Sequence, residues 1–150
     1  MASSFISNSV EETQNIALEL MPLILSSKIV LLKGDLGSGK TVISRAIIRL
    51  LCNDPHMIIT SPTFNILKTY QSTKFDLIAH YDLYRVKSLL EIEEIGLLEI
   101  INTQQNITLI EWPEIITPLI NQYLLTITLE HNPDNESRII KVDYPPITQK

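Results

Sequence analysis

The sequence predicts a single domain of mixed α/β class, and three observations carry this prediction. Strand-like and helix-like patterns alternate along the chain, and a glycine-rich loop joins a short apolar run to a helical pattern. The composition is that of a globular domain, because 45% of the 150 residues are apolar and 19% are charged. Four glycines, eight prolines and one cysteine exclude a collagen-like chain and a disulfide scaffold.

The charge balance limits the partners that the chain can attract. Twelve Lys and Arg stand against 17 Asp and Glu, so the formal net charge is −5 and the chain has no general attraction to the phosphate backbone of nucleic acids. Residues 1–15 contain neither Lys nor Arg, and no apolar run approaches the roughly 18 residues of a membrane span. We therefore expect a cytoplasmic protein without a membrane segment.

The first half of the chain has the pattern helix, strand, helix. Ser9 and Glu12 form a capping box ahead of apolar residues at helical spacing, and Pro22 is expected to end this helix. A short apolar run then leads into the glycine-rich loop, which favours a buried strand. Arg45 and Arg49 could face a partner or tRNA, but we expect them on the solvated face of the helix that follows the loop. The expected ranges are 10–21 and 40–51 for the helices and 28–32 for the strand.

The second half alternates turns with short strands. Ser88 and Glu91 form another capping box, which opens an acidic helix that Gly96 ends or interrupts. A buried apolar run ends at Glu111, and two alternating segments around a polar turn indicate a final hairpin. The expected strands are 57–59, 65–70, 75–81 and 107–110, followed by hairpin strands around 125–129 and 139–142.

Residues 34–41 fit the phosphate-loop pattern G-x-x-x-x-G-K-[ST], between a predicted strand and a predicted helix. Backbone N–H groups of such a loop point at phosphate oxygens, and the helix N-terminus adds partial positive charge. Lys40 would reach the β- and γ-phosphates, and the Thr41 hydroxyl would bind Mg²⁺. We therefore expect one P-loop NTPase-like, three-layer domain over residues 1–150, with a mixed, mostly parallel sheet and a C-terminal hairpin. The expected nucleotide-binding residues of the loop are Gly34, Asp35, Leu36, Gly37, Ser38, Gly39, Lys40, Thr41 and Val42.

Acidic and hydroxyl side chains elsewhere could complete this site. Glu111 ends the expected buried strand and is the candidate partner of Thr41 on Mg²⁺. Asp82 could position water or complete the metal shell, or it could be a cap or an ion-pair partner of Arg85. Thr63 could sense the γ-phosphate, although Ser-Pro-Thr is also ordinary turn chemistry. The three histidines show no metal-ligand spacing, and His80 is expected to pack beside the site without a catalytic role.

Five motifs in this order and spacing carry a family resemblance. They are residues 34–41, Ser61-Pro62-Thr63-Phe64, His80-Tyr81-Asp82-Leu83-Tyr84-Arg85, Glu94-Ile95-Gly96 and Ile110-Glu111-Trp112-Pro113. Together they closely resemble the TsaE (YjeE) family, the ATPase component of bacterial tRNA threonylcarbamoyladenosine synthesis. The resemblance covers about residues 9–142.

The resemblance implies a small cytoplasmic ATPase, slow in isolation, that uses ATP and Mg²⁺ and works with TsaB and TsaD. Those partners modify adenosine 37 of tRNA, so the chain would meet tRNA indirectly. Carried over residue by residue, the catalytic set is Lys40, Asp82 and Glu111, the metal ligands are Thr41 and Glu111, and Thr63 is the switch threonine. Trp112 and Arg85 are expected near the nucleotide or the partner interface, and the segment 9–13 near the adenine. Without the resemblance, the lone Trp112 could equally be a core or rim aromatic. Arg138 of the last hairpin could also contact nucleotide, but a surface charge is the favoured interpretation.

Other functions of a phosphate loop remain as alternatives. A P-loop kinase acting on a small metabolite would need an acceptor pocket and an arginine-rich lid, which the sequence does not display. A GTPase would need an Asn-Lys-x-Asp element, and no such tetrapeptide occurs. A third hypothesis is a nucleotide-sensing adaptor whose slow hydrolysis resets a protein complex. It overlaps with the function that the family resemblance implies, because both act by binding partner proteins.

Overall fold

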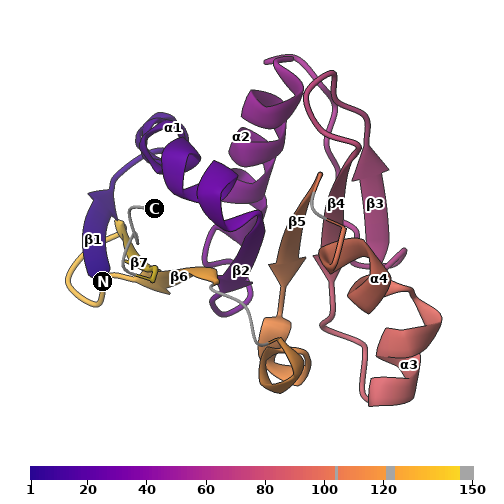
Figure 1. Ribbon diagram of the computed structural model, residues 1–150. Helices are drawn as coiled ribbons and strands as arrows, with labels where there is room; N and C mark the ends of the chain where they lie inside the picture. Colours follow the sequence, from indigo (N-terminus) through magenta and orange to yellow (C-terminus); the bar gives the residue numbers. More distant parts are fainter. Residues whose placement is uncertain (104, 121–123, 146–150) are drawn as a thin grey trace.

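The computed structural model describes residues 1–103, 105–120 and 124–145. Within them, seven strands form one sheet in the order β1-β7-β6-β2-β5-β4-β3 (Figure 1). Helices α1 and α2 pack on one face, and α3, α4 and the 3-10 helices η1 and η2 lie on the other. The elements are β1 (Ala2–Ser7), α1 (Val10–Ser27), β2 (Ile29–Lys33), α2 (Lys40–Cys52), β3 (Leu67–Tyr70), β4 (Leu77–Asp82), α3 (Leu89–Glu94), α4 (Leu97–Ile101), β5 (Asn106–Glu111), η1 (Pro113–Ile115), η2 (Thr117–Leu119), β6 (Leu125–His131) and β7 (Arg138–Asp143).

The sheet is mixed, as predicted, but it is only half parallel. Of its six strand pairings, β2 with β5, β2 with β6 and β4 with β5 are parallel. The predicted share of parallel pairings was too high, because β1 was not foreseen and pairs antiparallel with β7 at the edge. The predicted C-terminal hairpin is confirmed by the antiparallel pairing of β6 with β7.

The central strand β2 carries side chains into both cores. Val30 and Leu32 pack with α1 and α2, while Ile29 and Leu31 pack with α3 and α4 on the opposite face. Period-two alternation explains this division, since successive side chains of a strand point to opposite faces. A strand covered on both faces needs a continuous apolar run, which is why this segment was recognisable in the sequence.

Helix α1 runs six residues beyond its predicted end. The Ser9 side chain accepts the N–H of Glu12, as the capping box predicts, but the helix continues through Pro22 to Ser27. Proline removes the hydrogen bond to the carbonyl group of Leu18, and both residues are exposed, so water can hydrate that carbonyl. The apolar contacts of buried Ile24 favour the added turns.

The predicted strand over 57–59 is not formed. The Ile58 side chain is 87% exposed, and the carbonyl groups on either side of it accept hydrogen bonds from arginine side chains of α2. Arg45 donates to Ile59 and Arg49 donates to Met57, so the expectation that both arginines lie on a solvated helix face is wrong. The other predicted elements are present, with ends shifted by at most two residues apart from the end of α1.

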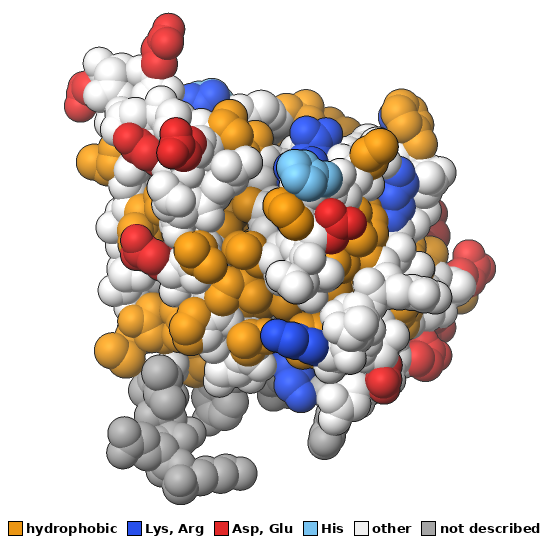
Figure 2. Space-filling model, turned by 90° about the horizontal axis from the view of Figure 1, so that it is seen from above, with side chains coloured by type: hydrophobic (Ala, Val, Ile, Leu, Met, Phe, Trp, Pro, Cys, Tyr) orange, Lys and Arg blue, Asp and Glu red, His pale blue; other side chains and the backbone are white. Residues whose placement is uncertain are grey.

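The outer face of α1 and α2 leaves apolar side chains exposed. They include Leu18 and Leu25 of α1 and Leu50 of α2. Figure 2, which looks onto the helices from above, shows hydrophobic side chains gathered on this face. Among the described residues, no helix combines the length and apolarity needed to cross a membrane.

Tyr81 of β4 is a fully buried side chain whose hydroxyl finds no hydrogen-bond partner among the described residues. Burial, with a smaller contribution from Glu99, raises the pKa of Tyr81 to about 12. An unfolded tyrosine loses its proton near pH 10, so the folded state loses stability as the pH rises from about 10 towards 12.

We expect Tyr81→Phe to leave the free energy of unfolding at pH 7 unchanged or to raise it by about 1 kcal/mol, because an unpaired buried hydroxyl is removed. The variant should also lose less stability than the unmodified chain at pH 11. Urea unfolding at both pH values measures this, with Tyr84→Phe at an exposed tyrosine as the control. A large loss at pH 7 would mean that the Tyr81 hydroxyl has a partner.

Candidate functional site

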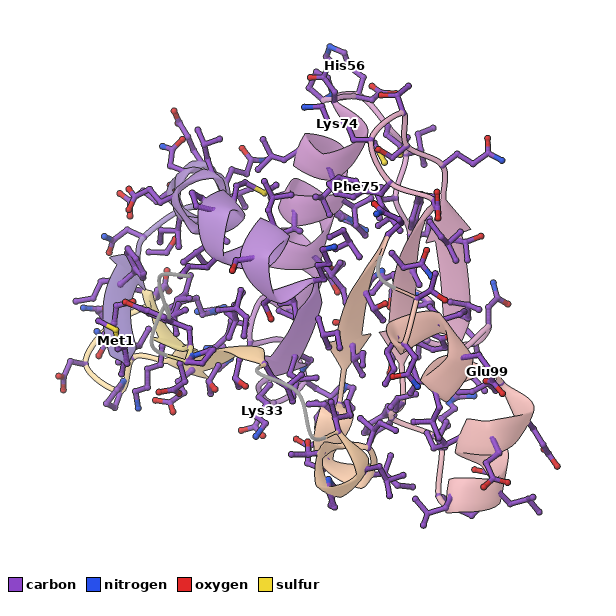
Figure 3. All side chains as sticks on the ribbon, viewed as in Figure 1. Met1, Lys33, His56, Lys74, Phe75 and Glu99 are labelled. Atoms are coloured by element: carbon purple, nitrogen blue, oxygen red, sulfur yellow. The ribbon has the colours of Figure 1, made fainter. Side chains whose placement is uncertain are left out.

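The glycine-rich loop lies at the carboxyl ends of β2, β5 and β4, which are three of the four adjacent parallel strands. β2 ends at Lys33, which Figure 3 labels at the lower edge of the sheet, and α2 begins at Lys40. The parallel register aligns Leu32 with Glu111 of β5, and Glu111 with Asp82 of β4. Three strand ends therefore bring the loop and both predicted carboxylates to one place.

The loop backbone requires glycine at its first position. Gly34 has a φ of 147°, and a Cβ atom there would lie 2.5 Å from the Ser38 hydroxyl oxygen and 2.6 Å from the carbonyl oxygen of Leu129. At the end of the loop, Gly39 caps α2 with a φ of 109° and provides no side-chain hydrogen bond. The first backbone N–H groups of α2 therefore have no side-chain cap. Such a helix N-terminus can bind an anion.

The Lys40 side chain folds back over this loop. Its ammonium group donates to the carbonyl oxygen of Asp35 at 3.0 Å and to that of Gly34, and it lies 4.1 Å from the centre of the Trp112 ring. Burial lowers the pKa of Lys40, and neighbouring carboxylates oppose this shift. These carboxylates are Glu111, Asp82, Asp35 and Glu114.

Glu111 is buried and paired with a histidine. The Nε2 atom of His80 lies 2.9 Å from Oε2 of Glu111, and both side chains are at most 4% exposed. With Glu111 ionised, His80 donates the Nε2 proton and fixes the orientation of the carboxylate. His80 was expected beside the site without a catalytic role, and its pairing with Glu111 was not foreseen, because a contact between β4 and β5 has no signature in the spacing of two residues 31 positions apart.

Asp82 is held by two donors, one for each carboxylate oxygen. The Thr63 hydroxyl donates to Oδ2 at 3.1 Å, and the backbone N–H of Tyr84 donates to Oδ1 at 3.0 Å. The Ser61 hydroxyl lies 2.7 Å from that of Thr63. The alternative in which Asp82 pairs with Arg85 is not observed, because Arg85 stacks on the Phe64 ring with its guanidinium carbon 4.6 Å from the ring centre.

These groups line one cleft of about 290 Å³. It brings together Leu36, Gly37, Gly39, Lys40, Thr41, Val42, Ser61, Thr63, Asp82, Glu111 and Trp112. Of the predicted site residues, Gly34, Asp35 and Ser38 lie outside it and line an adjacent hollow of about 370 Å³. Arg85 lines neither space, whereas Trp112 lies over Lys40 and contacts Tyr84 with ring centres 4.9 Å apart.

A second cavity, of about 260 Å³, opens on the other side of the loop. Residues 7–10 and Thr13 line it together with Gly37, Gly39 and Arg138. Part of the segment predicted to approach an adenine therefore shares one space beside the loop with Arg138, for which a surface charge was the favoured interpretation.

The side chains of the cleft fit Mg²⁺ only together with a phosphate ligand. No group of three or more His, Cys, Asp or Glu in the described parts of the chain is placed to hold a metal ion. Thr41 and Glu111 nevertheless provide oxygen donors in the same cleft. Mg²⁺ commonly takes one or two protein oxygens and completes its shell with phosphate and water.

Comparisons with known proteins agree on one family. A family model for the threonylcarbamoyl adenosine biosynthesis protein TsaE matches residues 7–140. The chain is similar to tRNA threonylcarbamoyladenosine biosynthesis proteins TsaE of three bacteria. That of Rickettsia conorii is 47% identical over 135 residues, covering 90% of this chain and 74% of the relative. That of Rickettsia prowazekii is 44% identical over 135 residues, 90% of each chain, and that of Bacillus subtilis is 33% identical over 129 residues, 86% of this chain and 78% of the relative.

A solved structure is also similar. The crystal structure of YdiB from Bacillus subtilis matches with a TM-score of 0.69 over 95% of this chain and 84% of that protein. At 24% sequence identity, this likeness supports the fold alone.

We expect Gly34→Ala to lower the free energy of unfolding by about 3 kcal/mol, because the new methyl group meets a backbone carbonyl that belongs to β6. Gly96→Ala is the matched control: its φ is 68°, but the nearest atom to its Cβ is 3.6 Å away. The control should cost about 1 kcal/mol from left-handed backbone strain alone. Urea unfolding compares the two, and equal losses would show that the loop can shift to admit the methyl group.

Proposed function

The chain belongs to the TsaE family of threonylcarbamoyl adenosine biosynthesis proteins, and on this premise we propose that it binds and hydrolyses MgATP. Hydrolysis would support the modification of adenosine 37 in tRNA, in the bacterial cytoplasm. One observation carries the proposal: Lys40 and Thr41, at an uncapped helix start, share a cleft with Asp82 and Glu111. We assign the activity to one P-loop NTPase-type domain over residues 1–150.

The loop and the start of α2 would bind the phosphates. Backbone N–H groups of residues 34–42 provide hydrogen bonds, and Lys40 would exchange its bonds to the loop carbonyl oxygens for phosphate oxygens. Trp112 would lie beside the bound nucleotide, since its ring already covers Lys40. The adenine would bind in the second cavity, which Arg138 and residues of the segment 9–13 line.

Thr41 and Glu111 would hold Mg²⁺ against the phosphates. The bound ion neutralises charge that develops on the phosphate oxygens. His80 bonds to Oε2 of Glu111, so Oε1 would be the oxygen available to the metal ion. His80 thereby orients the carboxylate towards the cleft.

Asp82 would orient the attacking water and accept its proton. Thr63 and the Tyr84 N–H group fix both carboxylate oxygens, so the side chain is held in one orientation at the cleft. Thr63 would respond to the γ-phosphate, because its hydroxyl lines the same cleft while it donates to Asp82. Lys40, Asp82 and Glu111 form the proposed catalytic set.

The proposed partners are TsaB and TsaD, through which the chain would act on tRNA indirectly. The net charge of −5 agrees with an indirect contact. The kinase alternative gains no support from the cleft, since Lys40 is the one cation among the described residues that line it. A kinase lid would bring arginines to this position.

We expect Asp82→Asn to lower kcat for ATP hydrolysis about 100-fold, the contribution typical of one general base, while the Kd for ATP changes by less than about threefold. Phosphate release measures the rate, and calorimetric titration measures the affinity. Asp76→Asn, at an exposed aspartate just before β4, is the control and should change neither value. An equal loss of rate and affinity would contradict the role of Asp82.

The chain should associate with TsaB and TsaD of the same organism when ATP and Mg²⁺ are present, and hydrolysis should then accelerate. A pull-down with ATP, with ADP and without nucleotide, combined with phosphate release, measures both effects. Lys40→Ala is the control variant, because it removes the cation of the cleft. ATP turnover without association in any state would overturn the tRNA-modification role, and failure of the unmodified chain to bind ATP would overturn the whole proposal.

A further inference from the structure

The segment that carries Ser61 and Thr63 reaches the cleft without belonging to the sheet. The chain leaves α2 at the upper edge of the molecule, where Figure 3 labels His56, whereas the loop begins after Lys33 at the lower edge. Residues 57–63 therefore return along the length of α2. In the described part of the chain, residues 58–61 make no backbone–backbone hydrogen bond.

Two arginines of α2 hold this returning segment. The Nε–H group of Arg45 donates to the carbonyl oxygen of Ile59 at 2.9 Å, and that of Arg49 donates to the carbonyl oxygen of Met57 at 3.0 Å. Both arginines are half-buried, and the Ile59 side chain is buried in the core that α2 shares with the sheet. The segment is thus fixed to α2 by side chains at two successive helical turns.

The spacing of the two arginines along α2 matches the spacing of the two carbonyl groups along the segment. Four residues of a helix advance about 6.0 Å, and two residues of an extended strand advance about 6.6 Å. The observed pairs, 49 with 57 and 45 with 59, advance by these steps, and the next position in the same series is 41 beside 61. Thr41 and Ser61 do line the same cleft, as this register requires.

The register leads directly to the proposed catalytic carboxylate. Ser61 lies within hydrogen-bond distance of Thr63, and Thr63 donates to Asp82. A segment displaced from α2 would carry both hydroxyl groups with it. Asp82 would then lose the hydrogen bond from Thr63, although the phosphate loop itself would be unchanged.

We propose that Arg45 and Arg49 are positioning residues for ATP hydrolysis: they clamp residues 57–59 to α2 and so set Ser61 and Thr63 in the cleft. The inference rests on the proposed function. It assigns to the Nε–H groups a task that the positive charge alone cannot perform, because a hydrogen bond to a carbonyl fixes distance and direction.

Two substitutions separate the N–H group from the charge. Glutamine places its side-chain amide nitrogen at the same number of bonds from the backbone as the Nε atom of arginine, whereas methionine has a similar length and no donor. We expect Arg45→Met to lower kcat about tenfold with the Kd for ATP changed by less than about twofold, and Arg45→Gln to retain at least about half of the activity. Equal losses in the two variants would overturn the clamp in favour of a role for the charge, such as binding a partner or tRNA.

A double-mutant cycle tests whether Arg45 acts through Thr63. If it does, Arg45→Met combined with Thr63→Ala should hydrolyse ATP no more slowly than Thr63→Ala alone. Multiplied losses would overturn the inference. Arg49→Met, one turn further from the cleft, should lower kcat less than Arg45→Met, and it keeps the test open if the latter fails to fold.

A measurement without nucleotide is also available. The ¹³C resonance of the Ile59 carbonyl should move in Arg45→Met and remain near its original position in Arg45→Gln, since only methionine removes the donor. An unchanged resonance in both variants would overturn the clamp. If the unmodified chain shows no hydrolysis while the resonance responds as expected, the proposed function fails and the clamp stands as a structural feature only.

Discussion

The site depends on how the protein holds the ammonium group of Lys40 at the uncapped start of α2. Burying Lys40 costs free energy, as its lowered pKa shows, and the protein offsets the cost with carbonyl oxygens of the loop, the Trp112 ring and nearby carboxylates. The carbonyl oxygens can face the ammonium group only if the loop turns sharply, which the conformation and close packing of Gly34 allow. Two features around Lys40 therefore accompany its charge: the sharp turn at Gly34 and the carboxylates at the ends of β4 and β5.

The sheet supplies the precision that the loop cannot. Asp82 and Glu111 lie opposite each other in a parallel register between β4 and β5, and apolar layers on both faces hold these strands. A slip of β4 by one residue against β5 would turn the side chains of β4 to the other face of the sheet and separate Asp82 from Glu111. The isoleucine-rich cores thus contribute to chemistry by fixing which face the carboxylates share with the phosphate loop.

The parts of this structure that were predictable from sequence are those with local signals. The capping boxes at Ser9 and Ser88, the loop 34–41 and the buried run before Glu111 each contain their own evidence, and all four were found where expected. β1 was missed because its exposed, serine-rich alternation gains its partner only when β7 folds beside it. The pairing of His80 with Glu111 and the donation by Arg45 to Ile59 join residues that are adjacent only in space, so spacing could not reveal them. The end of α1 was predicted wrongly for the opposite reason. Pro22 is a local signal for a helix end, but the burial of Ile24 in the next turn outweighs the hydrogen bond that proline removes.

Each proposed functional group already has a partner within the protein, and this shapes how a ligand can bind. Lys40 holds two carbonyl oxygens, Glu111 holds His80, and Asp82 holds Thr63 and a backbone N–H group. Phosphate binding at Lys40 must exchange bonds, so the affinity is a difference between two sets of hydrogen bonds rather than the sum of the new ones. An exchange at Thr63 would be transmitted to the segment that Arg45 holds, because that segment has no ladder of its own to absorb the movement. Under the proposed function, the occupancy of the γ-phosphate end of the site and the position of residues 57–63 would therefore depend on each other, which is the property that nucleotide-dependent binding of a partner protein needs.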